Sequence, residues 1–188
     1  MANKDSVGIC NLALTMLSTS RIASLTEDSE NARKCNAIYD LTRDALLTDS
    51  YWNFALKEAS LALVDDTPTI EDWAYIFQVP TDCLLIIHND GNYPYMIVGN
   101  KLYSNESTAK VRYIKRVEDA STFSNSFIRA FAARLAADLA YGITQNATLA
   151  EGMEKKALIA IKEAKWTDSQ EGIGNVPIGS SFITERGL

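Results

Sequence analysis

The chain has 188 residues, a length that predicts one domain with a sizeable buried core. Hydrophobic residues make up 47% of it and charged residues 22%, a composition that excludes disordered, collagen-like and disulfide-scaffold proteins. Twenty-four acidic against 18 basic side chains leave a net charge of −6, which argues against a surface that coats nucleic acid or anionic membrane as a whole. A local basic patch remains compatible with this balance.

The histidine and cysteine content narrows the chemistry further. His88 is the single histidine, so a two-histidine zinc site is excluded, and no Cys-x-x-Cys pair replaces it. Cys10, Cys35 and Cys83 are odd in number and widely spaced, which favours free, mostly buried thiols. Apolar runs fall short of the roughly 18–20 residues of a membrane span, and the N-terminus lacks a signal-peptide pattern. We therefore expect a protein made in a cytoplasm, with no membrane contact, no metal and no cofactor.

Two amphipathic helices are predicted at the start of the chain, over residues about 6–17 and 29–48. Asp5 or Ser6 is the N-cap candidate of the first. Acidic residues at the start of the second place negative charge where the helix dipole favours it. The apolar stripes are Ile9, Leu12, Ala13, Met16 and Leu17 in the first helix, and Ala32, Cys35, Ile38, Tyr39, Ala45 and Leu46 in the second.

Short runs of β-branched and aromatic residues follow over about 51–118 and predict an antiparallel β-meander. Asp90-Gly91 and Gly99-Asn100 are typical hairpin turns, each flanked by such runs. Several aromatic residues alternate as in strands, and we interpret them as core that seats the sheet on the helices rather than as a sugar- or base-stacking platform. These residues are Trp52, Phe54, Trp73, Tyr75 and Phe77.

Helical periodicity returns over about 124–145 and 148–166 and predicts an antiparallel helix hairpin. Alanines make the first of these helices thin enough for close packing, and Thr148 with Glu151 has the spacing of a capping box in the second. The sequence thus predicts an α+β, mainly helical fold. A bundle of about four helices, with the β-meander inserted between the second and third, forms one domain over 1–171.

The segment 172–188 follows the last helix and is rich in glycine and serine. A frayed tail is the ordinary interpretation of such a terminus. Its apolar residues are unusually many for a disordered segment, however, so we predict an extended docking arm. The expected anchors are Ile173, Val176, Ile178, Phe182 and Ile183.

The order of sequence motifs over residues 6–171 resembles that of one protein family. NLALTML, YWNFALK and the W-x-Y-x-F-x-V-P-T-D-C-L run from Trp73 to Leu84 come first. VGNKLYSN, VRYIKRVEDASTFSNSFIRAFAARLAADLAYGIT and the helix ending AKWTDSQE follow. In this order they resemble the tail tubular protein A and head-tail adaptor family of short-tailed, podovirus-type bacteriophages.

This resemblance implies a mechanical role in the virion rather than an enzymatic one. Such proteins form a ring, typically of twelve copies, between the portal protein and the tail nozzle (tail tubular B-like) protein. The ring completes the channel through which genomic DNA leaves without specific binding. Adaptors of this family that use an extended C-terminal segment insert it into the portal, and we expect the arm 172–188 to dock on the portal or on a neighbouring subunit. Ring closure needs heterologous contacts, for which the exposed faces of the last two helices are candidates.

The run 110–116 is a second candidate surface, because it holds four cations in seven residues. They are Lys110, Arg112, Lys115 and Arg116, interleaved with Tyr113 in a pattern that nucleic-acid sites also use. Two other interpretations stand beside nucleic-acid binding: a partner-facing strand that meets an acidic surface, and a solvated strand edge that charge protects from aggregation. A channel must let DNA slide, so direct DNA binding ranks third.

Catalytic alternatives rest on weaker patterns. Asp65-Asp66 and Glu71-Asp72 offer carboxylates for a cell-wall hydrolase, which needs two carboxyl groups roughly 5–10 Å apart, one with a raised pKa. Adjacent carboxylates in a loop are more typical of a solvated surface. Cys83 and His88 stand at an odd offset in one predicted strand, so they should point to opposite faces rather than form a nucleophile–base pair.

Overall fold

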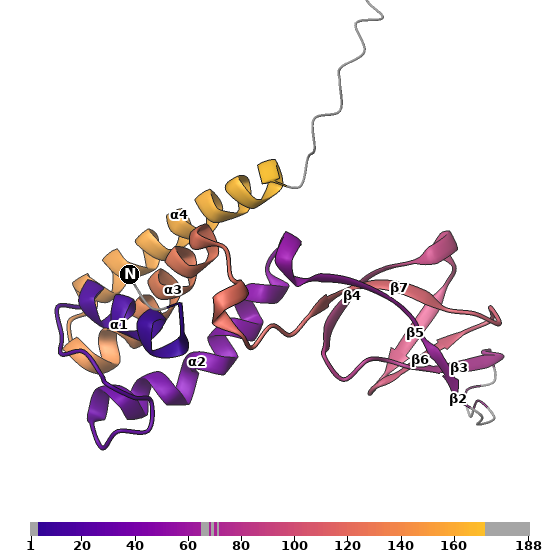
Figure 1. Cartoon of the computed structure of the whole chain (residues 1–188), viewed down its shortest axis with the longest axis horizontal. Helices are drawn as coiled ribbons and strands as arrows, with labels where there is room; N and C mark the ends of the chain where they lie inside the picture. Colours follow the sequence, from indigo (N-terminus) through magenta and orange to yellow (C-terminus); the bar gives the residue numbers. More distant parts are fainter. Residues whose placement is uncertain (1–3, 65–67, 69, 71, 172–188) are drawn as a thin grey trace, which may run out of the picture.

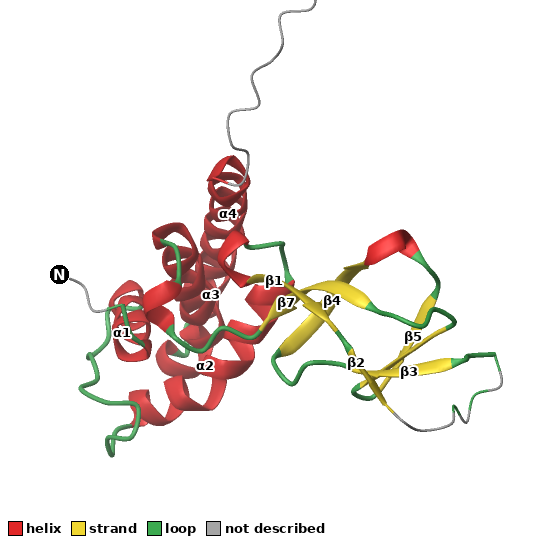
Figure 2. Ribbon diagram, turned by 45° about the vertical axis from the view of Figure 1, so that its right-hand side comes forward, coloured by secondary structure: helices red, strands yellow, loops and turns green. Residues whose placement is uncertain are grey.

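The computed structural model describes residues 4–64, 68, 70 and 72–171, and over these residues the chain has the predicted α+β architecture. Helices α1 (Ser6–Met16) and α2 (Glu30–Thr48) precede the strands, and α3 (Asn125–Thr144) and α4 (Ala147–Glu171) follow them. The helices gather at one end of an elongated molecule and the strands at the other, as Figures 1 and 2 show. The predicted arm 172–188 lies outside the described residues.

Helices α1, α2 and α3 begin where a short polar side chain accepts a backbone N–H. Asp5 caps α1, Ser29 caps α2 and Ser124 caps α3. In each case the side-chain oxygen accepts from the residue three positions on, at 2.6, 3.2 and 3.2 Å respectively. Local sequence alone therefore sets the start of these helices.

The start of α4 differs from the predicted capping box at Thr148 and Glu151. Asn146 is the cap, because its Oδ1 accepts the backbone N–H of Leu149 at 3.1 Å. Gln145, with a left-handed φ of 52°, and Asn146 form the whole connection between α3 and α4. So short a turn starts α4 at Ala147 and places Thr148 inside the helix, where it cannot act as its cap.

The buried face of α1 is rotated from the predicted stripe. Cys10 and Leu14 are buried beside Ile9 and Ala13, whereas Leu12 is 37% exposed. This short helix carries apolar residues on more than one face, so packing against α3 selects the buried one.

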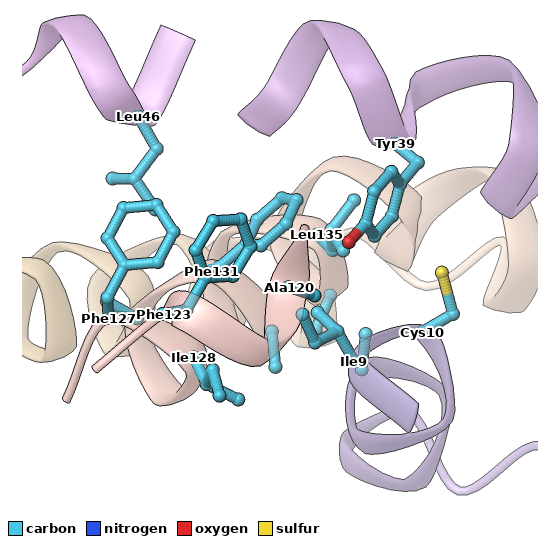
Figure 3. Close-up of a cluster of buried hydrophobic side chains, with 14 of the residues drawn as sticks. Ile9, Cys10, Tyr39, Leu46, Ala120, Phe123, Phe127, Ile128, Phe131 and Leu135 are labelled. Carbon is cyan, nitrogen blue, oxygen red and sulfur yellow. The ribbon is translucent and has the colours of Figure 1, made fainter. Parts of the chain in front are cut away.

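The helical core is built around aromatic rings from α3 and from the segments that precede β1 and α3. The Phe127 ring lies 4.9 Å from both Trp52 and Phe123, centroid to centroid, in edge-to-face arrangements. Trp52 also donates its Nε1–H to the carbonyl oxygen of Leu46 at 2.8 Å. Figure 3 shows Phe123, Phe127 and Phe131 side by side under α2. Of the five aromatic residues predicted as core, Trp52 and Phe77 are buried and the others are half-buried.

Within the described residues the strands form two antiparallel sheets, with orders β1-β7-β4 and β2-β3-β6-β5. The strands are β1 (Leu56–Ser60), β2 (Ala62–Val64), β3 (Tyr75–Gln78), β4 (Cys83–Asn89), β5 (Tyr95–Val98), β6 (Lys101–Ser104) and β7 (Lys110–Lys115). Short 3-10 turns η1 (Asn53–Ala55), η2 (Asp90–Asn92) and η3 (Ala120–Thr122) lie between elements. Both sheets contribute to a small second core of Leu61, Phe77, Val79, Ile86, Leu102, Val111 and Tyr113.

The two predicted hairpin turns have different outcomes. Gly99 and Asn100 join β5 to β6 in a two-residue hairpin, and Gly99 supplies the positive φ of 60° that such a turn requires. Asp90 and Gly91 do not close a hairpin, because β4 pairs with β7 rather than with β5. Turn η2 instead carries the chain from one sheet to the other. The insertion is antiparallel as predicted, but pairing between strands distant in sequence sets its order.

Candidate functional site

The basic run at 110–116 lies on β7, the central strand of its sheet. β7 pairs with β1 on one side and with β4 on the other. The interpretation of a solvated strand edge is therefore wrong. It failed because the position of a strand within a sheet depends on partners far away in sequence, here β1 at 56–60.

The structure divides the four cations between different places. Lys110 and Arg112 are both exposed on β7 and line a shallow pocket of about 180 Å³. Arg116 instead reaches α2, where its Nε donates to Asp44 Oδ2 at 2.8 Å. Lys115 is half-buried at the end of β7. The four cations do not form one continuous patch.

Acidic side chains balance the charge around Lys110 and Arg112. Arg112 donates to Glu58 Oε1 through Nε at 2.9 Å and through Nη2 at 2.5 Å, and Asp90 lines the same pocket. The Arg112 and Glu58 side chains are 54% and 59% exposed, so water screens the pair and its contribution to stability is small. This face is close to neutral, unlike the positive grooves that track a phosphate backbone.

A polar joint around Asp82 links the sheets to the helices. The Asp82 carboxylate accepts from Tyr113 Oη at 2.9 Å and from Lys57 Nζ at 3.0 Å, and its carbonyl oxygen accepts the backbone N–H of Arg116 at 2.6 Å. Burial acts to raise the pKa of Asp82, but the hydrogen bonds from Lys57 and Tyr113 outweigh it and hold the pKa below its ordinary value. Because Arg116 also binds Asp44, the joint connects β4 and β7 to α2.

The side chains considered for catalysis stay apart in the described part of the chain. Cys83 and His88 stand at opposite ends of β4, roughly 16 Å apart along the strand. Burial raises the pKa of the Cys83 thiol, which disfavours the reactive thiolate. Over residues 4–64, 68, 70 and 72–171, no group of three or more His, Cys, Asp or Glu side chains is placed to hold a metal ion. Of the acidic pairs, Asp72 is exposed, and residues 65, 66 and 71 lie outside the described residues.

An apolar groove of about 520 Å³ lies between α2 and α4, over α3. Leu41 of α2 and Leu158 of α4 stand on opposite walls and are 73% and 59% exposed. Ile38 and Ala45 of α2 and Ile161 of α4 continue these walls. The predicted apolar stripes of the helices did not reveal the groove, because Leu41 and Leu158 lie outside them. A leucine outside the apolar stripe on each of two helices was the sequence pattern that could have indicated it.

The floor and one end of the groove are polar and already partnered. Arg134 of α3 contacts Asp138 on its own helix and donates to Glu154 of α4 at 2.8 Å. Thr42 of α2 donates to Asp138 at 3.1 Å. At the end of the groove, Lys165 Nζ pairs with Asp49 Oδ2 at 2.9 Å, which joins α4 to the end of α2. What the groove offers an incoming group is therefore mainly apolar surface.

The predicted docking residues Ile173, Val176, Ile178, Phe182 and Ile183 lie outside the described residues. No protein-family model and no curated protein matches the sequence. Among the described helices, none is long and apolar enough to cross a membrane. Three features of the described residues could contact a partner or transmit force: the groove, the face around Lys110 and Arg112, and the joint at Asp82.

Proposed function

We propose that the chain is a structural subunit of a phage head-to-tail adaptor ring, which binds the portal vertex and the tail nozzle and completes the DNA exit channel. The observation that carries this proposal is the order of the sequence motifs, which lie on or lead into elements of the described fold. NLALTM lies on α1, WNFA leads into β1 through η1, PTDCL leads into β4, and RAFAARLAADLA lies on α3.

The surfaces of the subunit support assembly through heterologous contacts. Ring closure requires two different surfaces on each copy. The helical end carries the apolar groove and the exposed Trp166 of α4, whereas the sheet end exposes Tyr93, Ile97 and Val98. The alanine-rich face of α3 is buried inside the subunit, so α4 is the better of the two helices proposed for contact with a neighbour.

Charge also supports a channel component rather than a DNA-binding protein. The net charge is −6, and Glu58 and Asp90 accompany the exposed cations of β7. Strong phosphate contacts would hold DNA in place, whereas a channel must release it. A near-neutral β7 face suits that requirement.

Electron microscopy of the protein alone and mixed with its portal tests the proposal. We expect weak self-association in gel filtration and closed rings, typically of twelve copies, on the portal. A stable closed dimer at micromolar concentration that the portal leaves unchanged would contradict the proposal, because such a dimer uses the same surface on both copies.

Nucleic-acid binding through Lys110 and Arg112 is the alternative, favoured by the exposed pocket that these two cations share. Its signature is an affinity for duplex DNA that falls with salt, with a logarithmic slope of about −0.9 per phosphate contact. We expect no specific binding at physiological salt. Tight, salt-sensitive binding that Lys110→Ala and Arg112→Ala remove would replace the adaptor proposal with this one.

A further inference from the structure

The groove between α2 and α4 is an apolar surface that faces solvent in the described residues. Its walls carry Leu41 and Leu158, both more than half exposed, although large side chains of this kind are usually covered when they line a concave site. The polar groups at its floor already have partners in Thr42, Arg134 and Glu154. An occupant should therefore be an uncharged, apolar segment.

The end of α4 places the remainder of the chain within reach of this groove. Lys165, which pairs with the groove residue Asp49, lies about 9 Å along the helix from Glu171, and Leu158 lies about 20 Å from it. An extended chain advances about 3.3 Å per residue, so Val176 and Ile178 reach about 16 and 23 Å from Glu171. A reversal over two residues takes about 6.6 Å of this length, so Val176 and Ile178 then lie about 10 and 16 Å back along α4, between Lys165 and Leu158.

The residues at that distance have the chemistry that the groove accepts. The run from Val176 to Ile183 reads VPIGSSFI and has no charged residue. Val176, Ile178 and Phe182 stand at even spacing, so an extended segment presents them on one face. Glycines at 172 and 174 permit the chain to reverse directly after α4, and Pro177 opposes any continuation of the helix.

We propose that the segment 172–188 turns back at the end of α4 and places Val176 and Ile178 in the groove between α2 and α4 of the same chain. The tether favours the same chain over a second copy, because an attached segment acts at an effective concentration of about millimolar. This inference goes beyond the adaptor role and stands without it. On an adaptor, the segment must leave the groove before it can dock on the portal.

Disulfide cross-linking in the full-length chain tests this placement. The background carries Cys83→Ser, and the native Cys10 and Cys35 are fully buried. One variant adds Leu158→Cys and Ile178→Cys; its matched control adds Ile159→Cys and Ile178→Cys. Leu158 and Ile159 are both 59% exposed and differ by one residue in their distance from Glu171, but only Leu158 lines the groove. A freely moving segment reaches both positions alike.

Under mild oxidation at micromolar concentration, we expect the Leu158 pair to form an intramolecular disulfide about tenfold faster than the Ile159 pair. A third variant combines Leu41→Cys, on the opposite wall of the groove, with Ile178→Cys. It should form its disulfide as fast as the Leu158 pair, which shows that the result does not depend on a structural change in α4. Equal rates for the groove pairs and the control overturn the proposal. Disulfide-linked dimers that increase with concentration overturn it too, because they assign the groove to a second copy. Neither result bears on ring formation with the portal, which electron microscopy tests separately.

Discussion

The helical end and the sheet end of the molecule are held together in different ways. In the helical end, Trp52, Phe123 and Phe127 form a cluster of rings surrounded by buried residues from all parts of the bundle. In the sheet end, short strands share a small core, and apolar residues such as Ile97 and Val98 remain exposed. We therefore expect stability to reside mainly in the helices and the sheets to open first, because regions with few buried contacts unfold locally.

The largest expected effect is the loss of a ring from the helical core. Phe127→Ala should lower the free energy of unfolding by about 3–5 kcal/mol, because it opens a cavity among the rings of Trp52, Phe54 and Phe123. Urea denaturation followed by circular dichroism measures it. Tyr141→Ala on the same helix is the control; Tyr141 is 63% exposed, so its loss should cost less than about 0.5 kcal/mol. Equal effects would show that the rings are not the centre of stability.

A substitution in the sheet core should act locally. Leu102→Ala should cost about 2–5 kcal/mol, near the lower end because short strands can relax around the cavity. Hydrogen exchange should accelerate in β3, β6 and β7 while α3 and α4 stay protected. Val98→Ala, on the exposed face of neighbouring β5, should change little. Uniform loss of protection in both ends would show that the two cores unfold as one.

The end of α4 is tied to η1 through Asp168, which is 5% exposed. Its carboxylate accepts the backbone N–H of Asn53 at 3.0 Å. Asp168→Ala should cost about 1–3 kcal/mol, because it leaves that N–H without its acceptor. Burial raises the pKa of Asp168 against the effect of the Asn53 bond, so its ionised form disfavours the folded state at neutral pH.

Asp168→Asn separates the hydrogen bond from the charge, because it keeps an acceptor and removes the buried charge. Its free energy of unfolding at neutral pH should equal or exceed that of the parent protein. A loss as large as that of Asp168→Ala would contradict this account of the charge.

The smallest effect concerns the joint between the two ends. The pKa of Asp82 is held below its ordinary value, so its ionised form stabilises the folded protein at neutral pH. That contribution is lost as the pH falls below about 4, through the lowered pKa. Lys57→Met removes one cause of the shift, so stability should fall less steeply with acid than in the parent protein. If the curves of unfolding free energy against pH are parallel for Lys57→Met and the parent protein, this account of the joint is wrong. Lys156→Met on α4 is the control and should follow the parent curve.

The helices could be predicted from the sequence because their determinants are local. The expected range 29–48 became Glu30–Thr48, and 124–145 became Asn125–Thr144, with Ser29 and Ser124 as caps. Caps and apolar spacing act within one or two turns of a helix. The cap of α4 was mispredicted because Thr148 has the better local pattern, whereas the tight turn from α3 selects Asn146.

Local sequence patterns were enough to predict the helices, the hairpin at Gly99 and an antiparallel insertion between α2 and α3. Three features appear only in the folded chain: β7 lies between β1 and β4, Glu58 pairs with Arg112, and Leu41 and Leu158 line one groove. The physical reason is the range of the interactions. A helix bonds residues four apart, whereas strand pairing, ion pairs between strands and a groove between α2 and α4 join residues that only the folded chain brings together.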